Sequence, residues 1–143
     1  TMIEAWFDGS FRLNDGNHIM GIGGVVKVDG VEVYCFADTL REQGSSNTAE
    51  YLALIKVLEF LLEAKYNGPI LIRGDSKLVI NQINGFWAVK EGTYVLAAFK
   101  AAELFKELKN AKIKWTSRYN NIESDKLSKY AKTTEVGSSP KKS

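Results

Sequence analysis

The sequence has few of the residues that form disulfides or bind structural metal ions in small domains. Its 143 residues include one cysteine, Cys35, so no disulfide can form within the chain. A single histidine, His18, beside that cysteine cannot supply the ligands of a structural zinc site. This cysteine usage fits a reducing, cytoplasmic compartment.

Long apolar runs are also missing. No stretch approaches the roughly 18 consecutive apolar residues that a membrane-spanning helix needs, so we expect no membrane partner. The first residues carry acids and Trp6 where a secretory leader has a basic stretch and an apolar run, so we expect no leader. Hydrophobic residues make up 45% of the chain, which is enough for the core of one globular domain. No exposed apolar heptad is present, which favours a monomer.

Charge is nearly balanced overall but unevenly distributed, with a formal net charge of +2. Residues 106–143 contain ten Lys and Arg against four acids, whereas residues 1–105 contain nine against thirteen. A basic segment beside an acid-rich remainder suits a protein that binds a polyanion next to carboxylates. A solvated helix followed by a basic tail would give the same counts.

Three strands are predicted in the first forty residues. Apolar and polar residues alternate from Ile3, and we expect Asp8-Gly9-Ser10 to close this first strand with a turn. Asp29-Gly30 is a strong two-residue hairpin signal, so the second and third strands should pair in an antiparallel meander. The further predicted segments are a polar loop over residues 14–18 and strands over residues 19–28 and 31–38.

The rest of the chain alternates predicted helices and strands. A strand that is reached through a helix implies parallel pairing with a right-handed crossover. The predicted elements are helices over residues 47–66, 76–84, 94–109 and 121–133, and strands over residues 70–73 and 112–117. The fold class is therefore α/β, with a mixed five-stranded sheet of three antiparallel and then two parallel strands, flanked by helices. We expect residues 1–133 to form the domain and residues 134–143 to form a disordered basic tail.

Four carboxylates stand at predicted element boundaries: Asp8, Glu50, Asp75 and Asp125. Each has an ordinary structural interpretation. Asp8 fits a turn, Glu50 fits a capping box with Asn47, Asp75 fits a helix N-cap, and Asp125 fits a solvated helix face.

Considered together, the four acids are predicted to meet at one end of the sheet. Asp8 and Asp75 are expected at the carboxyl ends of strands, where α/β sheets usually present ligand sites. Four clustered carboxylates would repel one another and their pKa values would rise, unless cations neutralise them. An all-oxygen ligand set suits Mg²⁺ or Mn²⁺, and two such ions are a standard device for phosphodiester cleavage.

The residues around these acids resemble the type 1 ribonuclease H family, in its short-loop bacterial and archaeal branch. The resemblance covers about residues 2–132 and includes the predicted order of elements. It is carried by Asp8-Gly9-Ser10, residues 47–54 (Asn-Thr-Ala-Glu-Tyr-Leu-Ala-Leu), Gly74-Asp75-Ser76, residues 78–85, and residues 118–125 (Arg-Tyr-Asn-Asn-Ile-Glu-Ser-Asp).

This resemblance implies an endonuclease that hydrolyses the RNA strand of RNA–DNA hybrids and leaves 5′-phosphate and 3′-hydroxyl ends. It implies that Asp8 bridges two divalent cations, Mg²⁺ or Mn²⁺. Asp125 would help to hold the ion that activates water, and Glu50 and Asp75 would hold the ion at the leaving oxygen. Glu50 would also contact the 2′-hydroxyl that distinguishes RNA from DNA. The implied substrate-binding residues are Gly9, Ser10, Ser46, Asn47 and Ser76, of which Asn47 would read the minor groove of the hybrid.

The sequence departs from the family pattern at several positions. Residues 14–18 replace the family's Gly-Asn-Pro-Gly loop, and Lys77 stands where some members have glutamine. Arg118 matches a basic residue of the short-loop branch that contacts phosphate or eases product release, although it could instead be a surface residue paired with Glu123. Phe86 and Trp87 could contact a DNA backbone, but we expect them to be buried.

Two other functions are compatible with these features. The same fold is found in metal-dependent exonucleases, resolvases and integrases, which act on other nucleic acids. A catalytically weak or inactive hybrid-binding module would share the fold as well, although the four intact acids argue against loss of activity.

Overall fold

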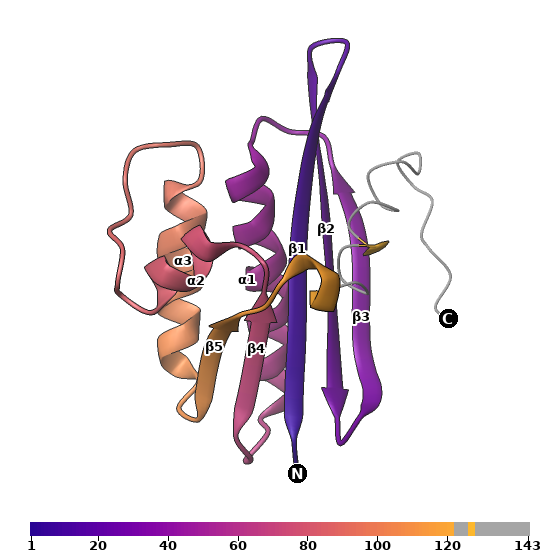
Figure 1. Ribbon diagram of the computed structural model, residues 1–143, viewed down its shortest axis with the longest axis vertical. Helices are drawn as coiled ribbons and strands as arrows, with labels where there is room; N and C mark the ends of the chain where they lie inside the picture. The colour runs from indigo at the N-terminus through magenta and orange to yellow at the C-terminus, as the bar shows by residue number, and fades with distance from the viewer. Residues whose placement is uncertain (122–125, 128–143) are drawn as a thin grey trace.

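The computed structural model describes residues 1–121 and 126–127 of the chain (Figure 1). Its elements follow the predicted order through the fifth strand. They are β1 (Ile3–Asn14), β2 (Asn17–Val28), β3 (Val31–Leu40), α1 (Ser46–Ala64), β4 (Ile70–Gly74), α2 (Lys77–Ile83), α3 (Val95–Glu107), β5 (Ala111–Trp115) and the 3₁₀ helix η1 (Arg118–Asn121). Among these described helices, none is both long and apolar enough to cross a membrane.

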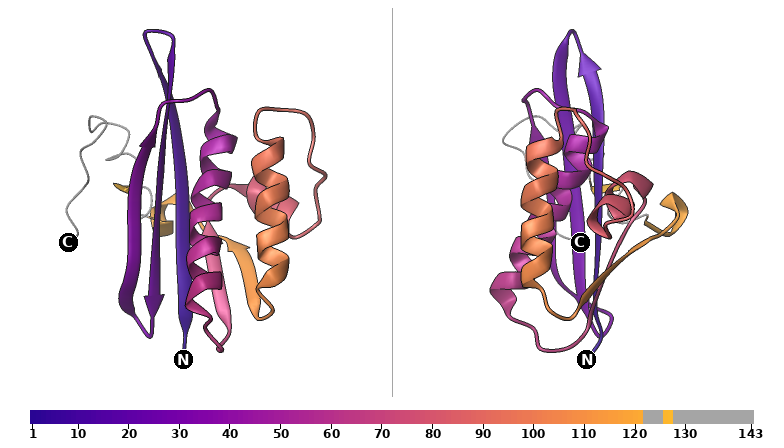
Figure 2. Two further views of the ribbon diagram at one scale, coloured as in Figure 1. Left: turned by 180° about the vertical axis from the view of Figure 1, so that it is seen from behind. Right: turned by 90° about the vertical axis from the view of Figure 1, so that its left-hand side faces the viewer.

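The five strands form one sheet in the order β3-β2-β1-β4-β5. β1 pairs antiparallel with β2 and parallel with β4, and β5 pairs parallel with β4. This is the predicted arrangement of three antiparallel and two parallel strands. α1 packs across β1 and β2, and α3 lies beside α1 on the same face of the sheet (Figure 2).

The core lies between α1 and the sheet. Alternate residues of β1 point toward the helix, and Ile3, Ala5 and Phe7 are at most 1% exposed. The predicted apolar face of α1 is likewise buried, and it comprises Leu54, Val57, Leu58 and Leu61. The packed core therefore fixes the position of α1 against β1, which later determines the position of Glu50.

The first hairpin differs from its prediction. β1 continues through Asp8-Gly9-Ser10 to Asn14, and β2 begins at Asn17, so the predicted loop over residues 14–18 is a two-residue turn. Both turn residues, Asp15 and Gly16, have positive φ (51° and 78°), as do Asp29 and Gly30 in the predicted second hairpin (50° and 81°). The same Asp-Gly chemistry acts in both places, because a type I′ turn needs positive φ at both central residues.

Other corrections concern helix ends and two aromatic residues. Helices α2 and α3 are each one to two residues shorter than predicted at either end. Phe86 and Trp87 were expected to be buried but are 76% and 48% exposed. Arg118–Asn121 forms a turn of 3₁₀ helix where the last helix was expected to begin, and Lys126 and Leu127 are helical. The remainder of that helix, Glu123, and the predicted boundary between residues 133 and 134 lie outside the described residues.

Candidate active site

Asp8 and Asp75 are brought together by the parallel pairing of β1 with β4. The last residues in register are Trp6 and Arg73, and each acid lies two positions farther along its own strand direction. β4 ends at Gly74, whereas β1 runs on beyond it (Figure 1). Asp8 was predicted at the end of its strand and instead lies within it. The two acids still meet at the carboxyl end of β4, which is the expected edge of the sheet.

Glu50 reaches the same place from α1. Its carboxylate Oε1 accepts a hydrogen bond of 3.0 Å from the backbone N–H of Gly9. A Cβ on Gly9 would lie 2.2 Å from the carbonyl carbon of Ala49, so only glycine permits this approach of helix and strand. The close contact explains why glycine follows Asp8.

The predicted capping box is wrong. The N-cap of α1 is Ser45, whose hydroxyl accepts from the Thr48 N–H at 3.2 Å, and not Asn47. Because the helix begins two residues earlier than a cap at Asn47 would allow, Glu50 is not needed for capping. Its side chain is therefore available to the site.

The three carboxylates form a compact, buried cluster. One oxygen from each of Asp8, Glu50 and Asp75 lies within 4.8 Å of the other two. Asp8 is 3% and Glu50 is 7% exposed, and the Asp75 side chain is 4% exposed. Burial raises the pKa of Glu50 well above its usual range, and the charges of Asp8 and Asp75 raise it further. A divalent cation would relieve this repulsion, so the donor set fits Mg²⁺ or Mn²⁺.

The raised pKa of Glu50 predicts a pH-dependent stability for the metal-free protein. Between the usual value near 4.5 and the raised value, the native state holds a proton that the unfolded chain has lost. Stability therefore falls as pH rises through this window. Glu50→Gln removes the ionisation and keeps an oxygen for Gly9, so its melting temperature in chelator should exceed that of the wild type at pH 7. At pH 4 the two should agree. Thermal unfolding from pH 4 to 8 measures this, and parallel curves would contradict the expectation.

Asp75 is further held by residues of the last described turn. Asn121 is buried and donates from Nδ2 to the Phe7 carbonyl at 3.0 Å and to Asp75 Oδ2 at 3.5 Å. Arg118 Nε lies 3.9 Å from the same carboxylate oxygen, while 75% of its side chain is exposed. Arg118 was predicted from the sequence, whereas the hydrogen bonds of Asn121 to Phe7 and Asp75 were not. The one feature of the sequence that points to Asn121 is that it is a polar residue soon after the last predicted strand.

The remaining predicted residues take different positions around the cluster. Ser10 lies two positions after Asp8 on β1, so it is on the same face, and its hydroxyl has no hydrogen-bond partner among the described residues. Ser46 is exposed and Asn47 is partly buried in the first turn of α1. The Ser76 hydroxyl caps α2 by accepting from the Val79 N–H at 3.2 Å. Asp125 lies outside the described residues.

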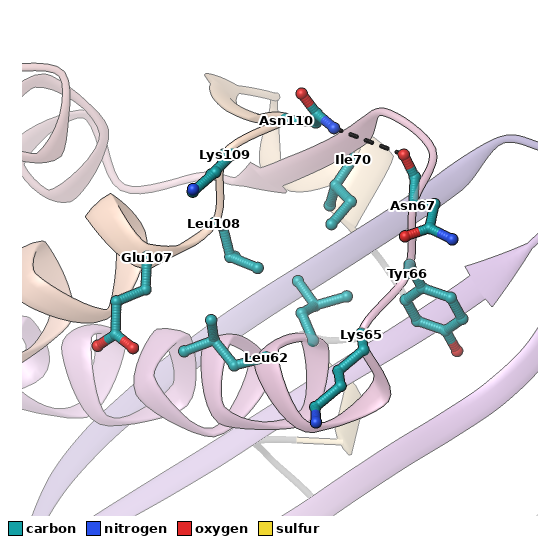
Figure 3. A pocket seen from close by; sticks show the side chains of 10 residues that line it. Leu62, Lys65, Tyr66, Asn67, Ile70, Glu107, Leu108, Lys109 and Asn110 are labelled. Atoms are coloured by element: carbon teal, nitrogen blue, oxygen red, sulfur yellow. Dashed lines mark hydrogen bonds between the residues drawn. The ribbon is translucent and has the colours of Figure 1, made fainter.

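A separate hollow of about 310 Å³ lies near the carboxyl ends of α1 and α3 (Figure 3). Its lining includes Leu62, Lys65, Ile70 and Leu108. Ile70 begins β4, whereas Asp75 follows its end, so the hollow is at the opposite end of the sheet from the acids. It is therefore not part of the carboxylate site.

The sheet order and the carboxylate cluster define a ribonuclease H-like domain. Solved structures support this class, since the ribonuclease H1 of the halophilic archaeon Halobacterium salinarum superposes with a TM-score of 0.80 at 31% identity. That match covers 92% of this chain and 97% of the other. Residues 6–131 match the family described as reverse transcriptase-like. The chain belongs to that family.

Other relatives agree with this assignment. The ribonuclease HI of H. salinarum is 33% identical over 129 residues, which are 90% of this chain and 63% of that protein. The bifunctional protein Rv2228c of Mycobacterium tuberculosis is 30% identical over 89% of this chain and 34% of its own length. A ribonuclease H1 called LC11, which was isolated from compost by a metagenomic approach and solved with an RNA/DNA hybrid, superposes with a TM-score of 0.79 at 30% identity. It covers 91% of this chain and 96% of the other. The matched residues make up 63% of the H. salinarum ribonuclease HI and 34% of Rv2228c, so the chain spans less than two thirds of these two relatives.

Proposed function

We propose that this protein is an endonuclease that hydrolyses the RNA strand of RNA–DNA hybrids, giving 5′-phosphate and 3′-hydroxyl ends. The observation that carries the proposal is the buried convergence of Asp8, Glu50 and Asp75 within 4.8 Å. It is supported by membership of the family and by the hybrid bound to LC11 ribonuclease H1. We propose that it acts as a monomer, because its sequence has no exposed apolar heptad, and that it acts in a reducing, cytoplasmic compartment, which its single cysteine favours.

The cofactors in this proposal are two divalent cations, Mg²⁺ or Mn²⁺. Asp8, Glu50 and Asp75 would hold them, together with Asp125. Bound ions of this kind lower the pKa of water and neutralise charge on the phosphate and the leaving oxygen. The cluster fits such ions because its ligands are all carboxylates, and because burial and then the charges of Asp8 and Asp75 raise the pKa of Glu50, which a bound cation would oppose.

The protein's own groups orient the substrate. Glu50 is fixed by the Gly9 N–H, and in the proposed complex its second carboxylate oxygen accepts from the RNA 2′-hydroxyl. Asn47 and Ser46 border the same end of α1, where they would contact the hybrid. Ser10 offers a hydroxyl on the Asp8 face of β1 that has no hydrogen-bond partner within the described part of the chain. Ser76 is already used as a helix cap, so its backbone is the better candidate for a substrate contact.

The direct test is cleavage of an end-labelled RNA–DNA hybrid. RNA duplex, DNA duplex and single-stranded RNA serve as matched substrates, each with Mg²⁺, with Mn²⁺ and with chelator. We expect metal-dependent cutting confined to the RNA strand of the hybrid. Cutting of DNA would assign the protein to another group of nucleases of this fold. Hybrid binding without cutting at any metal concentration would indicate an inactive binding module.

Arg118→Ala is expected to lower hybrid cleavage by about tenfold, which is a milder effect than loss of a metal-binding carboxylate. The guanidinium lies beside Asp75 but is largely exposed, so it can contact a phosphate without holding the cluster together. Steady-state kinetics with the hybrid would measure the loss, and Arg118→Lys should retain part of the activity. A fully active Arg118→Ala would make Arg118 an ordinary surface residue.

A further inference from the structure

Trp115 is tied to the backbone of the active site. It is the last residue of β5 and pairs in register with Gly74, the residue before Asp75. Its indole Nε1–H donates to the Asp75 carbonyl oxygen at 3.1 Å, and the Thr116 N–H donates to the Gly74 carbonyl at 2.9 Å. The side chain is nevertheless 46% exposed. A partly exposed tryptophan thus hydrogen-bonds to the backbone of Asp75, whose buried carboxylate belongs to the site.

Lys77 is held by the ring of this tryptophan. Its ammonium group lies 5.0 Å from the centroid of the Trp115 ring, within cation–π distance. Lys77 is the first residue of α2 and is exposed, and among the described residues it forms no ion pair. A lysine that contacts an aromatic face loses less conformational freedom when it binds an anion, because its side chain is already partly ordered.

The location of Lys77 gives it an electrostatic use. A cluster of three carboxylates repels a polyanionic strand, so cations beside the cluster are needed to hold the strand over it. Arg118 lies 3.9 Å from the carboxylate of Asp75 and shares its charge with that acid, whereas Lys77 has no acidic partner among the described residues, so it supplies a second cation. The Asp75 backbone, Trp115 and Lys77 form one connected path, which links the carboxylate to an exposed cation.

We propose that Lys77 is a substrate-binding residue that contacts a phosphate of the nucleic-acid strand lying over Asp75, and that Trp115 is its positioning residue. In this arrangement the indole ring directs the ammonium group, and the indole N–H fixes the backbone that carries Asp75. The proposal rests on the proposed function, because it takes the strand over the carboxylates to be the substrate.

The two roles of Trp115 can be separated by substitution. Lys77→Gln should raise KM for the hybrid about threefold to tenfold and leave kcat nearly unchanged. In a plot of log binding constant against log salt concentration, the magnitude of the slope should fall by about one, because one phosphate contact is lost. Trp115→Leu should reproduce this loss and also lower kcat, because both the ring and the N–H are removed. Trp115→Phe keeps an aromatic face but loses the N–H, so it should lower kcat while keeping the salt dependence of the wild type. Lys77→Arg keeps the positive charge, so its KM should stay close to that of the wild type.

Lys112→Gln is the matched control, because Lys112 is an exposed lysine of β5 that pairs with Leu71 near the other end of β4. It should leave both KM and the salt dependence unchanged. Thermal unfolding of each variant excludes loss of structure as the cause. The proposal is overturned if Lys77→Gln keeps the salt dependence of the wild type, or if Lys112→Gln matches its effect. Binding to the hybrid in chelator is measured in parallel, so the Lys77 contact is tested by affinity even where cleavage fails. Failure of wild-type cleavage would instead reject the proposed function.

Discussion

Asp75→Asn is expected to lower hybrid cleavage by about 10³-fold while the protein remains folded and still binds the hybrid. The amide has nearly the shape of the carboxylate, so it can keep the contacts with Asn121 and Arg118. It lacks the charge that a divalent cation requires from this position. The expected result is therefore a loss in kcat with little change in hybrid affinity or melting temperature, measured by steady-state kinetics, hybrid binding and thermal unfolding.

Asp38→Asn provides the control for this substitution. Asp38 makes a surface ion pair with Lys56 at 2.9 Å, and the side chains are 42% and 39% exposed. The same chemical change there should leave cleavage unaltered and cost at most about 1 kcal/mol of stability. Unchanged turnover in Asp75→Asn would reject the assignment of the carboxylate cluster as the catalytic centre.

Gly9→Ala is expected to destabilise the protein by about 3 kcal/mol and to lower its melting temperature by about 10 °C. The added Cβ would meet the backbone of Ala49 and Glu50 at 2.2–2.5 Å, and a helix backbone cannot move aside as the end of a flexible side chain can. α1 must therefore shift away from β1. The shift breaks the Gly9–Glu50 hydrogen bond and displaces Glu50, so cleavage should fall with stability.

Ser10→Ala tests whether this effect is specific to Gly9. The neighbouring serine hydroxyl has no hydrogen-bond partner among the described residues, so its removal should change stability by less than about 1 kcal/mol. Thermal and denaturant unfolding of the two variants give the comparison. A Gly9→Ala protein as stable as the wild type would mean that α1 and β1 leave room for a Cβ between Gly9 and Ala49.

Local signals in the sequence determined the order and type of the elements. The alternation that begins at Ile3, the Asp29-Gly30 turn and the apolar face of α1 depend on residues close to one another in the chain, and all three were confirmed. Turn chemistry at Asp15-Gly16 was equally local, but the surrounding polar residues made a longer loop the prediction. Phe86 and Trp87 were expected to be buried because aromatic residues usually are, yet their exposure depends on which parts of the chain pack over them.

The sequence by itself predicted which four acids form the site and at which end of the sheet they meet. Tertiary structure decided how three of them meet: the register of β1 with β4 sets Asp8 level with Asp75, and the close approach at Gly9 aims Glu50 at both. It also decided that Asn121 and Trp115 support Asp75. The contacts of Trp115 and Asn121 with Asp75, and of Asn121 with Phe7, join residues 40 to 114 positions apart, so no pattern of neighbouring residues records them. They arise only when packing and strand pairing fix the backbone.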